Sequence, residues 1–436
     1  MLLKCRFIFW LFIVLLIQND VQAQNEIDSL LSLLKIRNGI EKIDVLNSLS
    51  ISYRTTSLNK SLEYAEQSIK LSRRNNYKFG EGEGYKNRGI VYYLQHRYPE
   101  AVEEYEKAYK LFIEEKNEAK ISAILNNRAI IWVLQGEYDK ALEDYEKSIE
   151  INIELERFTS VANIYNNIGM VYYNWGNFDK TLEYYKKSLN LSIEQNNKIG
   201  IAASYNNLGL IQKSLGNYDQ ALEYYQKGID VNIEIGDKNG MSRCLFNMAS
   251  VYTELEQEDK ALALIKESLE LQKELNNEQG VLKSYSKLGQ LQLASGNYNE
   301  ALKSFESSLE VAKSKDSKEN IITAMSSIGD VYVKLKKYDK ALENYKYALQ
   351  LSEEIENINN IANIYYSIGE CYAIMGKKSN AIKNILLSID LAEKHSFVSL
   401  LEDAYYTISK LYHEIGDFQN GMSRCLFNMA SVYTEL

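Results

Sequence analysis

The sequence contains few of the residues that interrupt helices or bind metals. Among its 436 residues are one proline, Pro99, and three histidines, His96, His395 and His413. A chain with so little proline can form long uninterrupted helices. The histidines are widely separated, and no metal-ligand spacing relates them. We therefore expect a helical protein without a metal site, and no sequence feature requires a cofactor.

Only one long hydrophobic run occurs, from Phe7 to Ile17. Lys4 and Arg6 precede it, and the small residues Val21 and Ala23 follow at the spacing of a cleavage site. Residues 1–23 are therefore predicted to be a signal peptide, which implies an exported protein. An uncleaved membrane anchor is the alternative, although eleven apolar residues are short for a bilayer span.

Charge and cysteine content exclude further classes. The net charge of −9 disfavours a general affinity for nucleic acid or anionic membranes. Three cysteines lie beyond the predicted signal peptide, without a C-x-x-C motif. Cys244 and Cys371 are far apart in the sequence, and we expect both to be buried thiols that are not joined by a disulfide.

A strict period of 40 residues organises most of the chain. Small residues recur at Gly89, Ala129, Gly169, Gly209, Ala249, Gly289, Gly329, Gly369 and Ser409, and a second set runs from Ser61 through Ala101 to Ala381. Each period contains two helix-like runs, joined by a turn that often carries glycine. Such a period predicts an all-α solenoid of about ten antiparallel helix pairs.

Four segments are predicted. They are the signal peptide over 1–23, an N-terminal capping helix over 24–40, a tandem array over 41–420, and residues 421–436, which duplicate residues 240–255 out of frame. The identity extends over Asn239–Leu255 and Asn420–Leu436, which are 181 residues apart, so first-helix sequence falls in a second-helix position. We interpret the tail as a recombination or assembly join, with a recent duplication as the alternative.

We number the first helix of each pair so that the small residue is position 8. In the fourth pair, positions 4, 7, 8 and 11 are Tyr165, Ile168, Gly169 and Tyr172, which lie on one face of a helix and should pack on the second helix. With Thr181, Tyr185 and Ser188 in the second helix, the pattern resembles the tetratricopeptide repeat. The resemblance covers residues 41 to about 420 and implies a right-handed superhelix. The period of 40 residues, in place of the usual 34, is similar to that of kinesin light chains and spindle-orienting adaptors. The N-terminal residues Ser29-Leu30-Leu31, Leu46-Asn47 and Tyr64-Ala65 resemble those of exported Bacteroidetes-type repeat proteins, which implies a periplasmic or secreted protein of a Gram-negative bacterium.

No arrangement of residues supports catalysis. The run Gly80-Glu81-Gly82-Glu83-Gly84 has no preceding strand, and we assign it to an ordinary connection between repeats. No nucleophile lies beside a base. We therefore expect a binding protein and not an enzyme.

The resemblance implies a concave groove lined by positions 2, 5, 9 and 12. Asparagine recurs at positions 5 and 6, and apolar residues occupy positions 9 and 12 beside it; we predict that the peptide-binding residues are Asn126, Asn166, Asn206, Asn127, Asn167, Asn207, Asn247, Tyr93, Tyr173, Met170 and Leu210. Amide side chains both donate and accept hydrogen bonds, so a row of them can pair with the main chain of an extended peptide. Alternatively, the amides at position 6 brace neighbouring helices.

Position 9 becomes charged further along, at Asp330, Glu370 and Lys410, which predicts a less charged N-terminal half of the groove. Some relatives bind a C-terminal carboxylate with an asparagine at position 9, which this chain lacks. The predicted function is that of an exported scaffold or adaptor for a protein or an extended peptide segment. The alternative is the sensory ectodomain of a transmembrane histidine kinase, nucleotide cyclase or helix-turn-helix regulator.

Overall fold

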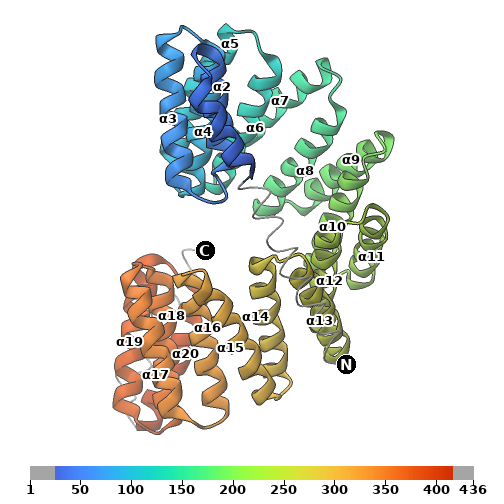
Figure 1. Ribbon diagram of the computed structural model, residues 1–436. Coiled ribbons are helices and arrows are strands. Elements are labelled where there is room, and N and C mark those ends of the chain that lie inside the picture. The colour runs from blue at the N-terminus through green and yellow to red at the C-terminus, as the bar shows by residue number, and fades with distance from the viewer. Residues whose placement is uncertain (1–24, 416–436) are drawn as a thin grey trace, which may run out of the picture. The chain divides into compact units, whose positions relative to one another are not determined.

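The computed structural model describes residues 25–415, and all regular secondary structure in this range is helical. A helix over residues 25–36 precedes nine helix pairs, repeats 1 to 9, and the single helix α20, Val398–Ile415 (Figure 1). The pairs are α2 (Gly39–Ser52) with α3 (Leu58–Arg74), α4 (Lys78–Leu94) with α5 (Tyr98–Glu114), α6 (Glu118–Leu134) with α7 (Tyr138–Glu154), α8 (Phe158–Asn174) with α9 (Phe178–Glu194), α10 (Lys198–Ser214) with α11 (Tyr218–Ile235), α12 (Lys238–Glu254) with α13 (Glu258–Glu274), α14 (Glu278–Ala294) with α15 (Tyr298–Ser314), α16 (Lys318–Lys334) with α17 (Tyr338–Glu354), and α18 (Ile358–Ile374) with α19 (Lys378–His395). The helical solenoid is confirmed.

The chain divides into two compact units between Asp237 and Lys238. Unit 1 contains α2 to α11, and unit 2 contains α12 to α20. The predicted signal peptide lies outside the described residues, and so do the second helix of the tenth pair and the duplicated tail. No helix in the described range is both long and apolar enough to cross a membrane.

The two helices of a repeat are antiparallel and packed closely at position 8. In repeat 4, a Cβ added to Gly169 would lie 2.5 Å from the Tyr185 ring of the second helix. Tyr185 is fully buried there, so the absence of a side chain at Gly169 makes room for its ring. The antiparallel arrangement also brings the first turn of one helix to the last turn of the other, as in the ion pair between Lys238 and Glu274 at 2.7 Å.

In each repeat from α4 to α19, the turn between the two helices contains one residue with left-handed backbone. It is glycine in five of the eight repeats from α4 to α19, with φ between 73° and 78°, whereas His96, Glu256 and Lys336 take the same position with φ of 56° to 59°. The predicted role of the turn glycines is confirmed. The connections between repeats also contain a left-handed residue, such as Asn196 at 50°.

Contacts between repeats use two helix positions that the sequence analysis did not assign to the core. Position 3 and position 10 are buried in every first helix from α4 to α18. In repeat 4 these residues are Ile164 and Val171, which pack with Ala129 and Tyr145 of repeat 3. Each first helix therefore has two buried faces, one towards its own partner and one towards the preceding repeat.

The first helices lie on the inner side of each unit. In unit 1, α2 contacts α4 and α8 contacts α10; in unit 2, α16 contacts α18 and α18 contacts α20. Second helices of neighbouring repeats make few such contacts or none. Because first helices are closer together than second helices, each unit curves with its first helices on the concave side.

Three smaller expectations can also be compared with the structure. The helix over residues 25–36 buries Ile27 against Leu49 and Tyr53 of repeat 1. Cys244 and Cys371 are both buried, and no disulfide joins them, as predicted. The assignment of Gly80–Gly84 to a connection is wrong, because these residues lie in the first two turns of α4. Glycines there allow neighbouring side chains to approach the helix; the Phe112 ring would be 2.8 Å from a Cβ on Gly82.

Candidate functional site

The predicted asparagines lie on first helices, and those of repeats 3, 4 and 5 belong to unit 1. Asn126 and Asn127 of α6, Asn166 and Asn167 of α8, and Asn207 of α10 are all half-buried. Asn206 is 8% exposed, which makes it the most enclosed of the set. Asn247 is half-buried on α12 and therefore belongs to unit 2.

Side chains at positions 5 and 6 are hydrogen-bonded between repeats. Nδ2 of Asn167 donates to Oδ1 of Asn126 at 3.1 Å. One repeat later, Nδ2 of Asn207 donates to Oδ1 of Asn166 at 2.9 Å. Each bond joins position 6 of one first helix to position 5 of the first helix in the preceding repeat. The amides therefore hold neighbouring first helices in register, whatever else they bind.

These bonds use only part of the hydrogen-bonding capacity of each amide. Within residues 25–415, Nδ2 of Asn126, Nδ2 of Asn166 and Oδ1 of Asn167 have no hydrogen-bond partner. Repeat 5 differs, because Nδ2 of Asn206 donates to Oδ1 of Asn207 at 3.3 Å. The unused donors and acceptor are thus concentrated on α6 and α8.

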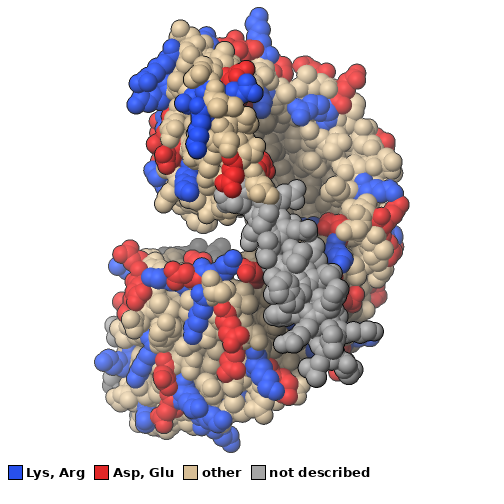
Figure 2. Space-filling model, viewed as in Figure 1, with Lys and Arg blue, Asp and Glu red and all other residues tan. Residues whose placement is uncertain are grey.

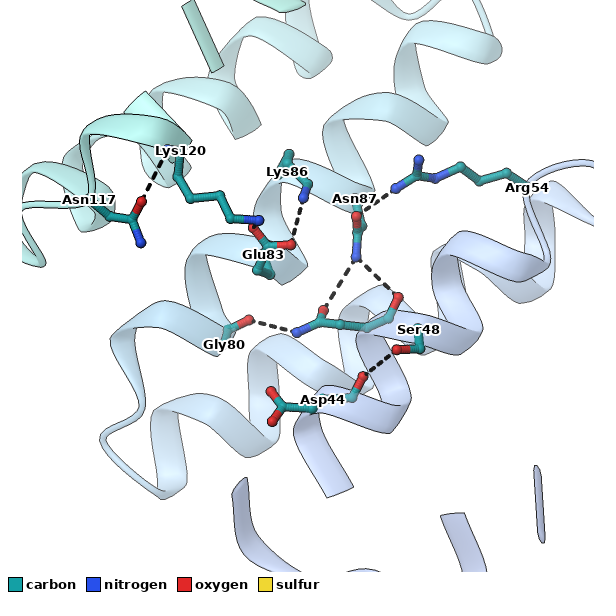
Figure 3. A network of polar contacts seen from close by, with 10 residues as sticks. Asp44, Ser48, Arg54, Gly80, Glu83, Lys86, Asn87, Asn117 and Lys120 are labelled. Atoms are coloured by element: carbon teal, nitrogen blue, oxygen red, sulfur yellow. Dashed lines mark hydrogen bonds and ion pairs between the residues drawn. The ribbon is translucent and has the colours of Figure 1, made fainter. Parts of the chain in front are cut away.

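Repeats 1 and 2 contain an equivalent bond between position 6 of one first helix and position 5 of the other. Nδ2 of Asn87, at position 6 of α4, approaches Oδ1 of Asn47 at 3.4 Å and its main-chain oxygen at 3.3 Å (Figure 3). Asn47 in turn donates to the main-chain oxygen of Gly80 at 3.1 Å. Arg54 donates to Oδ1 of Asn87 at 2.6 Å. Asn47 and Arg54 were not predicted as site residues, although they occupy positions 5 and 12 of repeat 1.

A buried charged cluster lies beside this network. Glu83, 8% exposed, forms ion pairs with Lys86 at 2.6 Å and with Lys120 at 2.9 Å (Figure 3). Burial raises the pKa of Glu83, but the two lysines outweigh it and the pKa lies below its usual range. Burial also lowers the pKa of Lys86 and of the Arg54 guanidinium.

The charged cluster adds a detail to the expectation of a less charged N-terminal half. That expectation rested on positions 9 and 12, where residues such as Met170 and Tyr173 are indeed uncharged. Positions 2, 5 and 12 of repeats 1 and 2 carry Glu83, Lys86 and Arg54. Within unit 1, only repeats 3 to 5 therefore have asparagine at position 5 with an apolar residue at position 9 and no charged residue at position 2. Elsewhere on the face shown in Figure 2, basic and acidic side chains are interspersed.

The predicted apolar residues flank the asparagines to different degrees. Met170 is 39% exposed, whereas Leu210, Tyr93 and Tyr173 are half-buried. The Tyr173 hydroxyl lies 2.9 Å from Oγ of Ser214, in the next repeat. Met170 is thus the predicted apolar residue most available to a ligand.

Carboxylates occupy position 9 in repeats 8 and 9 of unit 2. Asp330 accepts a hydrogen bond from the Tyr345 hydroxyl at 2.6 Å, and burial raises the pKa of Asp330 to about 6. Burial also raises the pKa of Glu370, which accepts from Tyr366 at 3.2 Å. Lys410 is exposed on α20. Within residues 25–415, no group of three or more His, Cys, Asp or Glu side chains could hold a metal ion.

Comparison with known proteins identifies the family to which the fold corresponds. The family model described as tetratricopeptide repeat matches residues 80–154, 160–234, 241–314 and 320–394, which is more than half of the chain. No curated protein sequence matches.

Three solved structures show the same fold at low sequence identity. A signal transduction ATPase with a tetratricopeptide repeat sensor, from Pyrococcus horikoshii, is 16% identical with a TM-score of 0.56, and the match covers 93% of this chain and 60% of that one. The apo quorum sensor NprR from B. thuringiensis is 18% identical with a TM-score of 0.50, covering 78% and 96%. Aspartyl phosphate phosphatase F from Bacillus subtilis is 13% identical with a TM-score of 0.50, covering 79% and 92%.

The matched ranges coincide with the repeats defined by the structure, from α4 to α19. Together with the helix pairing and the small residue at position 8, they establish the family. This chain belongs to the tetratricopeptide repeat family.

Proposed function

We propose that this protein is an exported scaffold that binds an extended segment of another polypeptide along α6 and α8 of unit 1. The observation that carries the proposal is the pair of bonds from Asn167 to Asn126 and from Asn207 to Asn166. They use the position 5 oxygens within the array and leave the Nδ2 donors of Asn126 and Asn166 without a partner among residues 25–415.

The remaining groups match a peptide main chain. Two donors, one on each of two successive first helices, suit main-chain carbonyl oxygens, and Oδ1 of Asn167 suits a main-chain N–H. Every residue of a ligand carries these groups, so binding through them does not depend on the ligand sequence. The exposed Met170 beside them would add apolar contact with ligand side chains. The function is recognition of a protein segment, and no reaction is assigned to the site.

The test separates main-chain binding from bracing of the array. Asn126→Asp together with Asn166→Asp keeps the oxygens that accept from Asn167 and Asn207, but replaces each unused N–H donor with an acceptor. Peptides selected from a random phage-displayed library on the wild-type protein would be synthesised and measured by fluorescence anisotropy. We expect the double variant to bind at least about tenfold more weakly, since two hydrogen bonds are lost.

A matched control carries the same added charge elsewhere. Asn190→Asp with Asn299→Asp places two carboxylates on exposed positions of second helices. The control should bind like the wild type. Equal affinity of both double variants, or failure of the wild type to select any peptide, would contradict the proposal.

Export is tested separately. The protein would be expressed with its own N-terminus in a Gram-negative host, followed by cell fractionation and N-terminal sequencing. We expect mature protein that begins at Gln24 in the periplasm or the medium. Full-length protein retained in the cytoplasm would contradict export without affecting the binding test.

A further inference from the structure

A pocket of about 340 Å³ lies in unit 2 and is lined by residues of the first helices α12 and α14 and of the second helix α13. Its size falls in the range of about 300–1,000 Å³ that is usual for ligand sites. The pocket is lined on α12 by Asn239, Ser242, Arg243, Phe246 and Asn247, on α13 by Ser268 and Gln272, and at the start of α14 by Asn277, Gln279, Gly280, Lys283 and Ser284. Because first helices form the concave side, this pocket is part of the groove of unit 2.

The equivalent place in unit 1, four periods earlier, is filled by the protein itself. There the Lys120 ammonium lies 2.9 Å from Glu83 and 5.5 Å from the centre of the Phe79 ring. Phe79 in turn packs on Phe112, with 6.0 Å between ring centres. An internal carboxylate, held by Lys120 and Lys86, thus occupies the space between α4 and α6.

Substitutions at the equivalent positions open this space in unit 2. Gly280 stands where Lys120 would be, and Gln272 stands where Phe112 would be. A Cβ on Gly280 would lie 2.2 Å from Oε1 of Gln272, so glycine is the residue that fits beside this glutamine. Arg243 replaces Glu83, which exchanges the internal carboxylate for a cation.

Two kinds of polar group without a partner among residues 25–415 belong to side chains that line this pocket. Gln272 is 5% exposed and donates to Asn239 at 3.2 Å and to Ser242 at 2.7 Å, but its buried Oε1 has no hydrogen-bond partner among the described residues. Arg243 and Lys283 are exposed and form no ion pair within residues 25–415. A buried acceptor without a donor is costly, so a donor from a ligand would be favourable.

We propose that this pocket binds an acidic side chain, aspartate or glutamate, of a polypeptide segment that lies in the groove of unit 2. The ligand carboxylate pairs with Arg243 and Lys283, taking the part that Glu83 plays in unit 1, and a main-chain N–H of the same ligand donates to Oε1 of Gln272 when that side chain turns from Gly280 towards the pocket. This inference rests on the proposed function, because it takes the ligand to be a polypeptide segment and adds a sequence preference in unit 2 to the main-chain recognition proposed for unit 1.

Two probes test the proposal with the full-length chain. The first is a peptide selected from the random library, made with glutamate or glutamine at its acidic position and with an amidated C-terminus. The second is N-acetylglutamate methylamide against its glutamine counterpart, compared by saturation-transfer NMR, which does not require the asparagines of unit 1. We expect the glutamate form of each probe to bind about tenfold more tightly, as for one charge-assisted contact.

The variant Arg243→Gln with Lys283→Gln should abolish this preference and leave the affinity for the glutamine forms unchanged. Lys266→Gln with Lys303→Gln removes the same charge from exposed positions of second helices and should retain the preference. Equal binding of both small probes to the wild type would overturn the inference. A preference that survives Arg243→Gln with Lys283→Gln, or that requires a free C-terminal carboxylate, would do the same.

The outcomes also distinguish the two proposals. Loss of peptide capture in the Asn126→Asp and Asn166→Asp variant concerns the main-chain site of unit 1. Loss of the preference for glutamate concerns Arg243, Lys283 and Gln272 of unit 2. If the library yields no peptide, the small probes still decide whether the pocket binds a carboxylate.

Discussion

Replacing Lys336 with glycine should stabilise the protein. Lys336 occupies the turn between α16 and α17 with φ of 59°, the left-handed region, and its side chain is exposed. The left-handed region destabilises the folded state by about 1–2 kcal/mol for a residue with a Cβ. Glycine avoids this cost but loses about 0.5–1 kcal/mol through the extra backbone entropy of the unfolded chain. The net gain in the free energy of unfolding should therefore be about 0.5–1 kcal/mol.

The measurement is urea unfolding of the full-length chain, followed by far-ultraviolet circular dichroism. Lys336→Gly should raise the midpoint without changing the slope. The neighbouring Lys337 has φ of −96°, so Lys337→Gly is the matched control and should lower the midpoint. Gly376→Ala, at the equivalent turn of the next repeat with φ of 73°, should also lower it. A lower midpoint for Lys336→Gly would refute the reasoning.

Three further perturbations follow from the packing and the charges. Gly169→Leu should destabilise unit 1 by at least about 3 kcal/mol, because the Tyr185 ring occupies the space that a side chain would need; thermal unfolding measures this. Glu83→Gln should cost about 1–3 kcal/mol in urea unfolding, since it leaves the half-buried Lys86 and Lys120 without their carboxylate. The pKa of Asp330, raised to about 6 from 3.8, means that the folded state keeps a proton that the unfolded state has lost. Stability should fall by up to about 3 kcal/mol as pH rises from about 4 to 6, and Asp330→Asn should remove this part of the pH dependence.

Each of these has a control that the same molecule supplies. Gly169→Ala should cost less than Gly169→Leu, since Ala129 already stands at the equivalent position of repeat 3. Glu118→Gln and Asp219→Asn remove exposed carboxylates and should change little. A Gly169→Leu variant as stable as the wild type, a neutral Glu83→Gln, or an unchanged pH dependence for Asp330→Asn would contradict the respective argument.

Sequence alone determined the helix pairs and most of the residues that join them. The 40-residue period aligned equivalent positions, so one amphipathic pattern could be read nine times. Position 8 was correctly predicted as a close helix crossing, and the turn glycines were correctly predicted as left-handed. Both follow from local geometry, because a small residue or a positive φ constrains the chain within one repeat. The groove asparagines were identified by their recurrence, and their role in binding stays a prediction.

Only the tertiary structure decided what each repeat contacts in the next one. The buried positions 3 and 10 and the bond from Asn207 to Asn166 join residues about 40 positions apart, at a rotation between repeats that a helical pattern does not contain. The contrast between Lys120, which fills its site, and Gly280, which leaves a pocket, also depends on that placement. A period specifies which residues are equivalent, whereas the packing of one repeat on another determines which of their polar groups are satisfied by the protein and which remain for a ligand.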